Sequence, residues 1–546
     1  MNVNLSAVSP LVTSSATTAR RTNSLAAATD AAAAQATAGY VALAASAASA
    51  TPTTSAVSVS LGQTSASTDA QTYTMTGRTT TAWSQRPGDA ISSLMAGNFG
   101  LPSLATRFNG LGAAMLKRFE TDAGGFSQSV TLATPGAASA SAIAPADLFA
   151  TADNQVKLSI KTASGATVEL SLGSQADGLS VEVKVSGGEL NDAERKALTQ
   201  LSGAFQDAID GLGDVPPKLA FGGFTDFDPK VLSSVDFTAR SKADGKGAIQ
   251  AVDFHADAKA RSLSATGPSG TVKVGVDLSQ PPILGNATQQ AQAVARYVRQ
   301  IDAAGSRGRG DAALVAMFKD AFSQLNSNYG VTAPLAGREA PGVIALNAGD
   351  HSLLSGLADF NASMVQAPDA SNPMRPDEVD TFSYKLSQDT SVTGKDPRNR
   401  TIHQDQQAQL VASFHRALSP EATLLLTAAK ESQFYEFVQI DDEAKASTDI
   451  TYKDGARTDA TVTQSARQST RVQRYLMGTL ESDTTVPLEG QRVSDVRNLL
   501  SSVEKADMSH DADDARRRDQ ALAVAASLAV LPDGPVGLRQ GSSAAV

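Results

Sequence analysis

The stretch 305–310, GSRGRG, is the best candidate for an anion site, because it combines glycines with Arg307 and Arg309. The backbone N–H groups of a glycine-rich loop bind phosphate when a strand precedes the loop and a helix N-terminus follows it. Here the preceding residues have helical spacing, and the pattern GxxxxGK[ST] is absent. We therefore predict a break between two helices, with Arg307 and Arg309 as a weak anion-site candidate and no bound cofactor.

Few histidines are available for metal binding or acid–base catalysis, since the chain contains only 5 His. His403 and His415 are the pair closest to an acid, Asp405. On a helix the two imidazoles lie about three turns apart, and on a strand they share one face at a separation of about 40 Å. Neither arrangement forms a metal site without distant ligands. We expect surface residues and no metal site.

Other catalytic groups also lack a local motif. The chain has no Cys, which excludes thiol nucleophiles, disulfides and Cys-ligated zinc. The serine-nucleophile pattern GxSxG is absent, and the similar stretch 267–270, GPSG, indicates a turn. The adjacent acids 441–442 and 513–514 are poor acid–base partners, because neighbouring side chains on a strand point to opposite faces. We expect these acids on solvent faces and assign no catalytic residue.

Composition excludes several classes of protein. The net charge of 546 residues is −10, which excludes a globally basic nucleic-acid binder. The densest basic run, 516–518, follows the acidic stretch 511–514 and has no neighbouring aromatic residue, so no nucleic acid is expected as a partner. No apolar run reaches the roughly 18 residues of a transmembrane helix. The composition thus indicates a soluble, acidic chain.

The N-terminal part is unlike the rest. Residues 1–71 are dominated by Ala, Ser and Thr, and such a segment buries too little apolar area to offset an ordering cost of about 1–2 kcal/mol per residue. We predict a disordered leader. It lacks a basic start, and Asp30 interrupts the apolar run after Arg20 and Arg21, so a cleaved signal peptide is not expected. The chain is expected in the cytoplasm or exported without signal cleavage.

The following residues indicate an α+β fold. We expect a short helical segment at 72–120, with one apolar helix face over 101–119, and a linker at 121–147. Residues 148–330 form a central α+β domain: three alternating runs predict an antiparallel sheet, Asn191 and Glu194 predict the start of one packed helix, and two apolar stripes at 294–325 predict a helical hairpin.

The C-terminal half has a weaker pattern. We expect an irregular and helical connector at 331–377, with a helix near 352–364. A second α+β region follows at 378–531, with strands near 382–386, 434–440 and 461–480. In this region 401–418 is a strand or a helix, and 420–432, 493–505 and 511–531 are helices. Residues 532–546 are expected to be a disordered tail.

Residues 156–278 carry a resemblance to known proteins. They combine a hairpin, the helix-forming sequence GELNDAERKALTQL and a following strand at 232–237. This order is similar to that of a group of uncharacterised proteobacterial proteins with Ser/Ala-rich N-termini, whose cores contain a strand, an "ELxxxExxAL" helix and a strand. The resemblance covers about a quarter of the chain and implies no activity and no site residue.

Together these features favour a non-enzymatic bacterial interaction or structural protein, exported or associated with secretion, with unidentified protein partners. Two alternatives stay open. One is an enzyme, for example a hydrolase, whose site is assembled from distant acids and hydroxyls in a deep cleft. The other is a secreted effector, for which 72–120 would bind a chaperone. The sequence assigns no oligomeric state.

Overall fold

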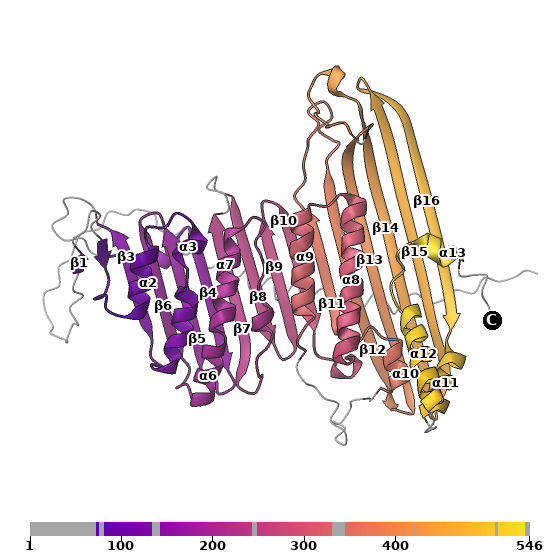
Figure 1. Cartoon of the computed structure of the whole chain (residues 1–546), viewed down its shortest axis with the longest axis horizontal. Coiled ribbons are helices and arrows are strands. Elements are labelled where there is room, and N and C mark those ends of the chain that lie inside the picture. Colours follow the sequence, from indigo (N-terminus) through magenta and orange to yellow (C-terminus); the bar gives the residue numbers. More distant parts are fainter. Residues whose placement is uncertain are drawn as a thin grey trace, which may run out of the picture. The chain divides into compact units, whose positions relative to one another are not determined.

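A computed structural model describes residues 73–75, 81–133, 142–242, 248–329, 344, 346–419, 421–507 and 512–540. The predicted disordered leader 1–71 lies outside the described residues, as do 541–546 of the predicted tail. The predicted α+β class is confirmed. In the described part, all the named strands belong to one 16-stranded antiparallel sheet (Figure 1).

The strands follow one another along the sheet almost in chain order. The exception is the block β4 to β6, which runs in reverse: β6 pairs with β3 and β4 pairs with β7, in the order β1-β2-β3-β6-β5-β4-β7 and then β8 to β16. Their bounds are β1 Tyr73–Met75, β2 Thr81–Trp83, β3 Phe126–Leu132, β4 Asn154–Thr162, β5 Thr167–Gln175, β6 Gly178–Ser186, β7 Leu232–Lys242, β8 Ile249–Asp257, β9 Ala260–Gly267, β10 Gly270–Asp277, β11 Asp359–Gln366, β12 Thr381–Asp396, β13 Asn399–Ala417, β14 Tyr435–Lys453, β15 Ala456–Leu476 and β16 Thr479–Asp495.

Most helices lie side by side on one face of this sheet, toward the viewer in Figure 1. The bounds of the α-helices are α2 Ala90–Asn98, α3 Leu104–Arg107, α4 Leu111–Lys117, α5 Pro145–Thr151, α6 Asp192–Gln200, α7 Ser202–Asp210, α8 Ala287–Gly308, α9 Ala312–Leu325, α10 Ala348–Ser352, α11 Arg497–Asp507, α12 Ala512–Leu528 and α13 Pro535–Gln540. We call the side that they cover the helix face. Helix α5 packs on the other side, the opposite face, where a Cβ at Gly173 would meet Phe149 at 2.9 Å.

Period-two patterning explains the N-terminal sheet. Val156, Leu158 and Ile160 are fully buried and pair across β4 and β5 with Leu172, Leu170 and Val168. The predicted capping box at α6 is confirmed, because the Asn191 side chain accepts from the N–H of Glu194 and the Glu194 carboxylate accepts from the N–H of Asn191, both at 3.0 Å. The polar residues of each strand line the opposite face.

The predicted helical hairpin forms α8 and α9, but the glycine run does not break α8 where the sequence indicates. Helix α8 continues to Gly308 and ends at Arg309, which has a left-handed φ of 54°. A Cβ on Gly308 would lie 2.7 Å from the ring of Phe382 in β12. The glycines therefore allow α8 to lie close to the sheet, and Asp311 caps α9 by accepting from the N–H of Leu314 (2.7 Å).

Several predicted elements are wrong. The expected helix at 352–364 is the strand β11, and β3 lies inside the expected linker at 121–147. The single helix face over 101–119 is divided between α3 and α4 at Gly110, whose φ is 72°. The expected helix at 420–432 has only the 3-10 turn Lys430–Ser432 among its described residues, and α13 lies in the expected tail.

The ranges 148–330 and 378–531 share one sheet. Strand β11 pairs with β10 on one side and with β12 on the other. Helix α8, assigned to the central domain, contacts C-terminal strands, and the Tyr297 hydroxyl donates to Oε1 of Gln406 in β13 (2.9 Å). Whether these ranges fold independently stays a prediction.

The strands lengthen toward the C-terminus, from 9 residues in β4 to 21 in β15. The pairing register aligns one row across β11 to β16, which consists of Val365, Ser383, Val411, Asp441, Ser469 and Pro487. Beyond this row β13 continues through 412–417, which is about 20 Å of strand. Figure 1 shows these strands extending past α8, α9 and the ends of β10 and β11. We call the part beyond the row, together with the loops 367–380 and 418–434, the projecting end.

Candidate functional site

At its far end, in the loop 418–434 and around the turn of β15 and β16, the projecting end exposes four large apolar side chains. The exposed fraction is 76% for Leu425, 41% for Phe434, 45% for Met477 and 45% for Leu480. The turn between β15 and β16 is fastened to the neighbouring loop, because the N–H of Gly478 donates to the carbonyl oxygen of Gln433 (3.3 Å). This bond places Met477 close to Phe434. We call the four exposed side chains the apolar tip.

Sequence neighbours of Leu425 explain why this leucine is exposed. Leu424 and Leu426 pack on a small aromatic core formed by Tyr435, Phe437 and Tyr475. Adjacent side chains of an extended segment point in opposite directions, so the leucine between two inward-facing ones points outward. The local sequence therefore places the Leu425 side chain in solvent.

A buried histidine lies beneath the tip, on the opposite face of β13. His415 is 6% exposed, and its Nδ1 lies 2.6 Å from Oδ1 of Asp380. Its Nε2 lies 3.3 Å from Oε2 of Glu378, which also accepts from the Tyr435 hydroxyl (2.6 Å). Burial by itself lowers the pKa of His415, but the hydrogen bonds with Asp380 and Glu378 outweigh burial and raise the pKa to about 9. The imidazole is therefore charged at neutral pH.

An arginine and two amides complete this cluster. The guanidinium of Arg375 lies over the ring of Tyr475, 4.4 Å from its centroid, and donates to the carbonyl oxygen of Gly478 (3.1 Å). Asn372 and Gln433 exchange two hydrogen bonds of 3.0 Å, and Asn372 also donates to the Tyr435 hydroxyl. The loop 367–380 is thereby fixed to β14 and to the turn of β15 and β16.

The chemistry of this cluster is structural. Both nitrogens of His415 face carboxylates, and the carboxylate of Glu378 faces His415 and Tyr435. Burial raises the pKa of Glu378, but the hydrogen bonds from His415 and Tyr435 lower it below its ordinary value. The charges of these groups offset one another. The cluster stiffens the base of the apolar tip.

The predicted anion-site arginines are each engaged within the chain. Arg307 forms a two-pronged ion pair with Asp442, with Nη2 2.9 Å from Oδ1, and also donates to the Thr470 hydroxyl (3.1 Å). Arg309 lies over the ring of Phe414, 4.9 Å from its centroid. The structure therefore places them on different partners, and the anion site stays a prediction.

Two predictions of solvent exposure are wrong. His415 is buried, and Asp442, expected on a solvent face, is 8% exposed because it receives the Arg307 guanidinium. His403 is half-buried between Asp405 (3.0 Å) and Asp449 (2.7 Å), whose hydrogen bonds raise its pKa to about 10. In the described ranges, no three His, Asp or Glu side chains are grouped so as to hold a metal ion.

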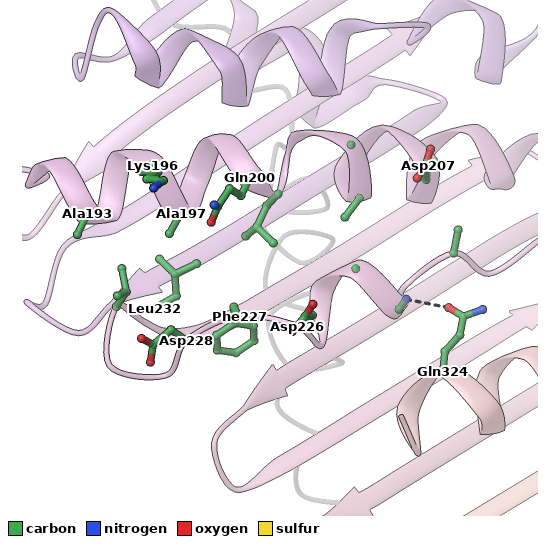
Figure 2. Close-up of a pocket in the computed structure, with 17 residues that line it drawn as sticks. Ala193, Lys196, Ala197, Gln200, Asp207, Asp226, Phe227, Asp228, Leu232 and Gln324 are labelled. Atoms are coloured by element: carbon green, nitrogen blue, oxygen red, sulfur yellow. Dashed lines mark hydrogen bonds between the residues drawn. The ribbon is translucent and has the colours of Figure 1, made fainter. Parts of the chain in front are cut away.

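A separate open groove of about 910 Å³ lies on the helix face, between α6, α7 and the loop 220–228 (Figure 2). Figure 2 shows Lys196 and Gln200 on the helix side and Asp226 and Asp228 on the loop. Asp228 accepts from the N–H of Lys230 (2.9 Å), and Gln324 of α9 accepts from the N–H of Gly222 (2.9 Å). These polar groups shape the loop, and the wide opening leaves the groove without the enclosure of a catalytic cleft.

Sequence reasoning missed the apolar tip, although a signal was present. Three adjacent leucines, 424–426, cannot share one face of a helix, so at least one must point away from the core. The cluster around His415 had no comparable signal, because its residues come from four segments between 372 and 475.

Comparison of the chain with protein-family models, with curated proteins and with solved structures gives no match. Among the helices that the structure describes, none has both the length and the apolar character required to cross a membrane.

Proposed function

We propose that this chain is a non-enzymatic interaction protein of a bacterium, and that it acts through the apolar tip. The observation that carries the proposal is the position of the four exposed side chains, at the far end of strands that continue about 20 Å beyond their neighbours. Exposed apolar side chains that gather in one place mark an interaction surface, whereas single exposed ones are ordinary.

The rigidity of the base supports the same proposal. Loops 367–380 and 418–434 are held by the ion pairs of His415 and by the hydrogen bonds between the side-chain amides of Asn372 and Gln433. A binding surface that is already ordered loses less conformational freedom when its partner arrives. The alternative, an enzyme, would be favoured by a cleft lined with carboxylates of raised pKa. The carboxylate whose pKa burial raises to about 7, Asp359, lies between the sheet and helix α8 instead.

Site-specific photo-crosslinking in the native cells tests this function. A photoreactive benzoylphenylalanine replaces Leu425 or Met477 in the full-length protein, and Val524, which is 49% exposed on α12, is the matched control position. We expect adducts of defined composition from 425 and 477 and none from 524. Adducts absent from both tip positions, or equally frequent at 524, would contradict the proposal.

A further inference from the structure

We propose that the partner of the apolar tip is a zwitterionic lipid surface, into which Leu425, Phe434, Met477 and Leu480 insert. This inference rests on the proposed function and specifies its partner. The four side chains come from the loop before β14 and from the turn of β15 and β16, and they are 41% to 76% exposed. A set of side chains that projects from strand ends suits a fluid apolar layer, which deforms around them.

The loop residues on either side of Leu425 carry no charge, whereas Glu431 lies three residues before Phe434 and Glu481 directly follows Leu480. The segment 422–429, ATLLLTAA, contains neither acids nor bases. Moving an ion into an apolar layer is far more costly than moving a hydroxyl or a methyl group, so this segment meets the first requirement for shallow insertion. The helices of the described residues do not cross a membrane, and the inference concerns the interface alone.

Charged residues of both signs lie on the strands next to the apolar tip. Arg474 and Glu481 form an ion pair (Nε–Oε2 3.1 Å) whose side chains are about half exposed. Arg416 donates from Nε to Oε2 of Glu436 (2.9 Å) on the adjacent strands. A zwitterionic headgroup presents a phosphate and a quaternary ammonium. Each ion pair offers one arginine for the phosphate and one glutamate for the ammonium. The net charge of −10 argues against an anionic membrane as the partner.

Vesicle flotation with phosphatidylcholine tests the inference on the full-length protein. We expect the wild-type protein to float with the vesicles and the double variant Leu425→Ser/Met477→Ser to bind at least tenfold less. The control Val524→Ser/Val536→Ser removes two apolar side chains of similar exposure, 49% and 57%, from α12 and α13 and should bind like the wild type. Absence of wild-type binding, or equal loss in both variants, overturns the inference.

A gain of signal provides a second readout. The only tryptophan, Trp83, is 2% exposed, so Leu425→Trp adds the one emitter at the tip. We expect its fluorescence to shift to shorter wavelength with phosphatidylcholine vesicles and to be quenched by nitroxide-labelled lipid, whereas Val524→Trp should not respond. A silent Leu425→Trp, with the thermal midpoint of the wild type, overturns the inference.

Two further outcomes separate this inference from the proposed function. Crosslinks from position 425 to a polypeptide in cells, without vesicle binding, overturn the lipid assignment and leave the interaction function standing. Replacing a third of the phosphatidylcholine by phosphatidylserine should weaken binding, because the chain is acidic. Binding that requires phosphatidylserine overturns the zwitterionic assignment.

Discussion

A charged imidazole under an apolar surface makes the projecting end sensitive to alkaline pH. The pKa of His415 in the folded protein, about 9, is above its ordinary value of 6.5. The stabilisation is therefore fully present below pH 6.5 and is lost as the pH rises through 9. The groups that face the imidazole are the carboxylates of Asp380 and Glu378, the Ser371 hydroxyl and the rings of Tyr435 and Phe437.

Tryptic cleavage after Lys430, in the loop fastened by this cluster, measures the effect. We expect cleavage to become roughly seventyfold faster between pH 7 and pH 10, because the pKa of about 9 in the folded protein lies well above the ordinary value of 6.5. His415→Gln should be cleaved quickly at pH 7 and show no further rise. His403→Gln, on the same strand but far from the loop, is the control, and a peptide substrate corrects for trypsin's own pH dependence. A rise that persists in His415→Gln would refute this account.

The buried carboxylate of Asp359 also makes the folded protein less stable as the pH rises, but over a lower pH range than His415. Burial raises its pKa to about 7, although Thr390 donates to it from its N–H (2.8 Å) and its hydroxyl (2.6 Å). The folded state binds this proton more tightly than the unfolded state, in which the pKa is about 3.9. The free energy of unfolding therefore falls as the pH rises from about 4 to 7.

Asp359→Asn removes this titration while keeping one acceptor oxygen for Thr390. Between pH 5 and pH 8 we expect this single group to lower the free energy of unfolding of the wild type by about 2–3 kcal/mol. The variant should lack that decrease. Urea unfolding at both pH values gives the comparison, and the same pH dependence in both proteins would show that Asp359 is already ionised at pH 5.

At the scale of elements, a helix glycine has one of two structural roles, and the local sequence does not distinguish them. Gly308 allows α8 to approach the sheet, where a Cβ would lie 2.7 Å from Phe382 and 3.0 Å from Ala412. Gly203 in α7 has no atom within 4 Å of the same position. The two residues form a matched pair, one against a packed sheet and one against solvent.

Replacing each glycine by alanine should change stability in opposite directions. Gly308→Ala is expected to lower the free energy of unfolding by about 1–3 kcal/mol, because the packed core must move. Gly203→Ala should raise it by up to about 1 kcal/mol, because alanine favours the helix. Chemical denaturation of the two variants measures both changes, and a stabilised Gly308→Ala would mean that α8 is not tightly seated.

The elements that the sequence predicts well are those whose periodicity has one interpretation. Strands β4 to β6 alternate cleanly, and α6 begins with a capping box. Phe360 and Met364 lie four apart, which fits a helix stripe and also one face of a strand. Pairing with β10 and β12 decides for the strand. The pairing with β10 joins Gly270 to Gln366, nearly a hundred positions apart, so no local pattern contains it.

The candidate site shows the same limit. Arg307 was identified from its glycine neighbours, whereas its partner Asp442 was assigned to solvent, because the contact spans 135 positions. The long strand β15 is rich in Thr, Gln and Arg, and β15 and β16 bury few large side chains. Their order depends on backbone hydrogen bonding to each other, which composition does not reveal.

At the scale of the molecule, the continuous sheet determines which helices can fold without the C-terminal strands. Helix α9 packs mainly on β10, with smaller contacts on β11 and β9, and its Gln324 side chain also holds the loop 219–222. Helix α8 packs on β12 and β13, through Tyr297 and Gly308. The two helices of one hairpin therefore depend on different halves of the chain.

The fragment 73–329 should consequently keep α9 ordered and lose α8. Its Tyr297 and Ile301, buried in the full chain, would face water once β12 and β13 are absent. In hydrogen exchange we expect the amides of 288–305 to exchange at least a hundredfold faster in the fragment than in the full chain, while those of 314–325 stay protected. Equal protection of both helices would mean that the hairpin is stable on the central sheet alone, so that 148–330 is an independent domain. Loss of both would mean that the sheet does not fold in parts.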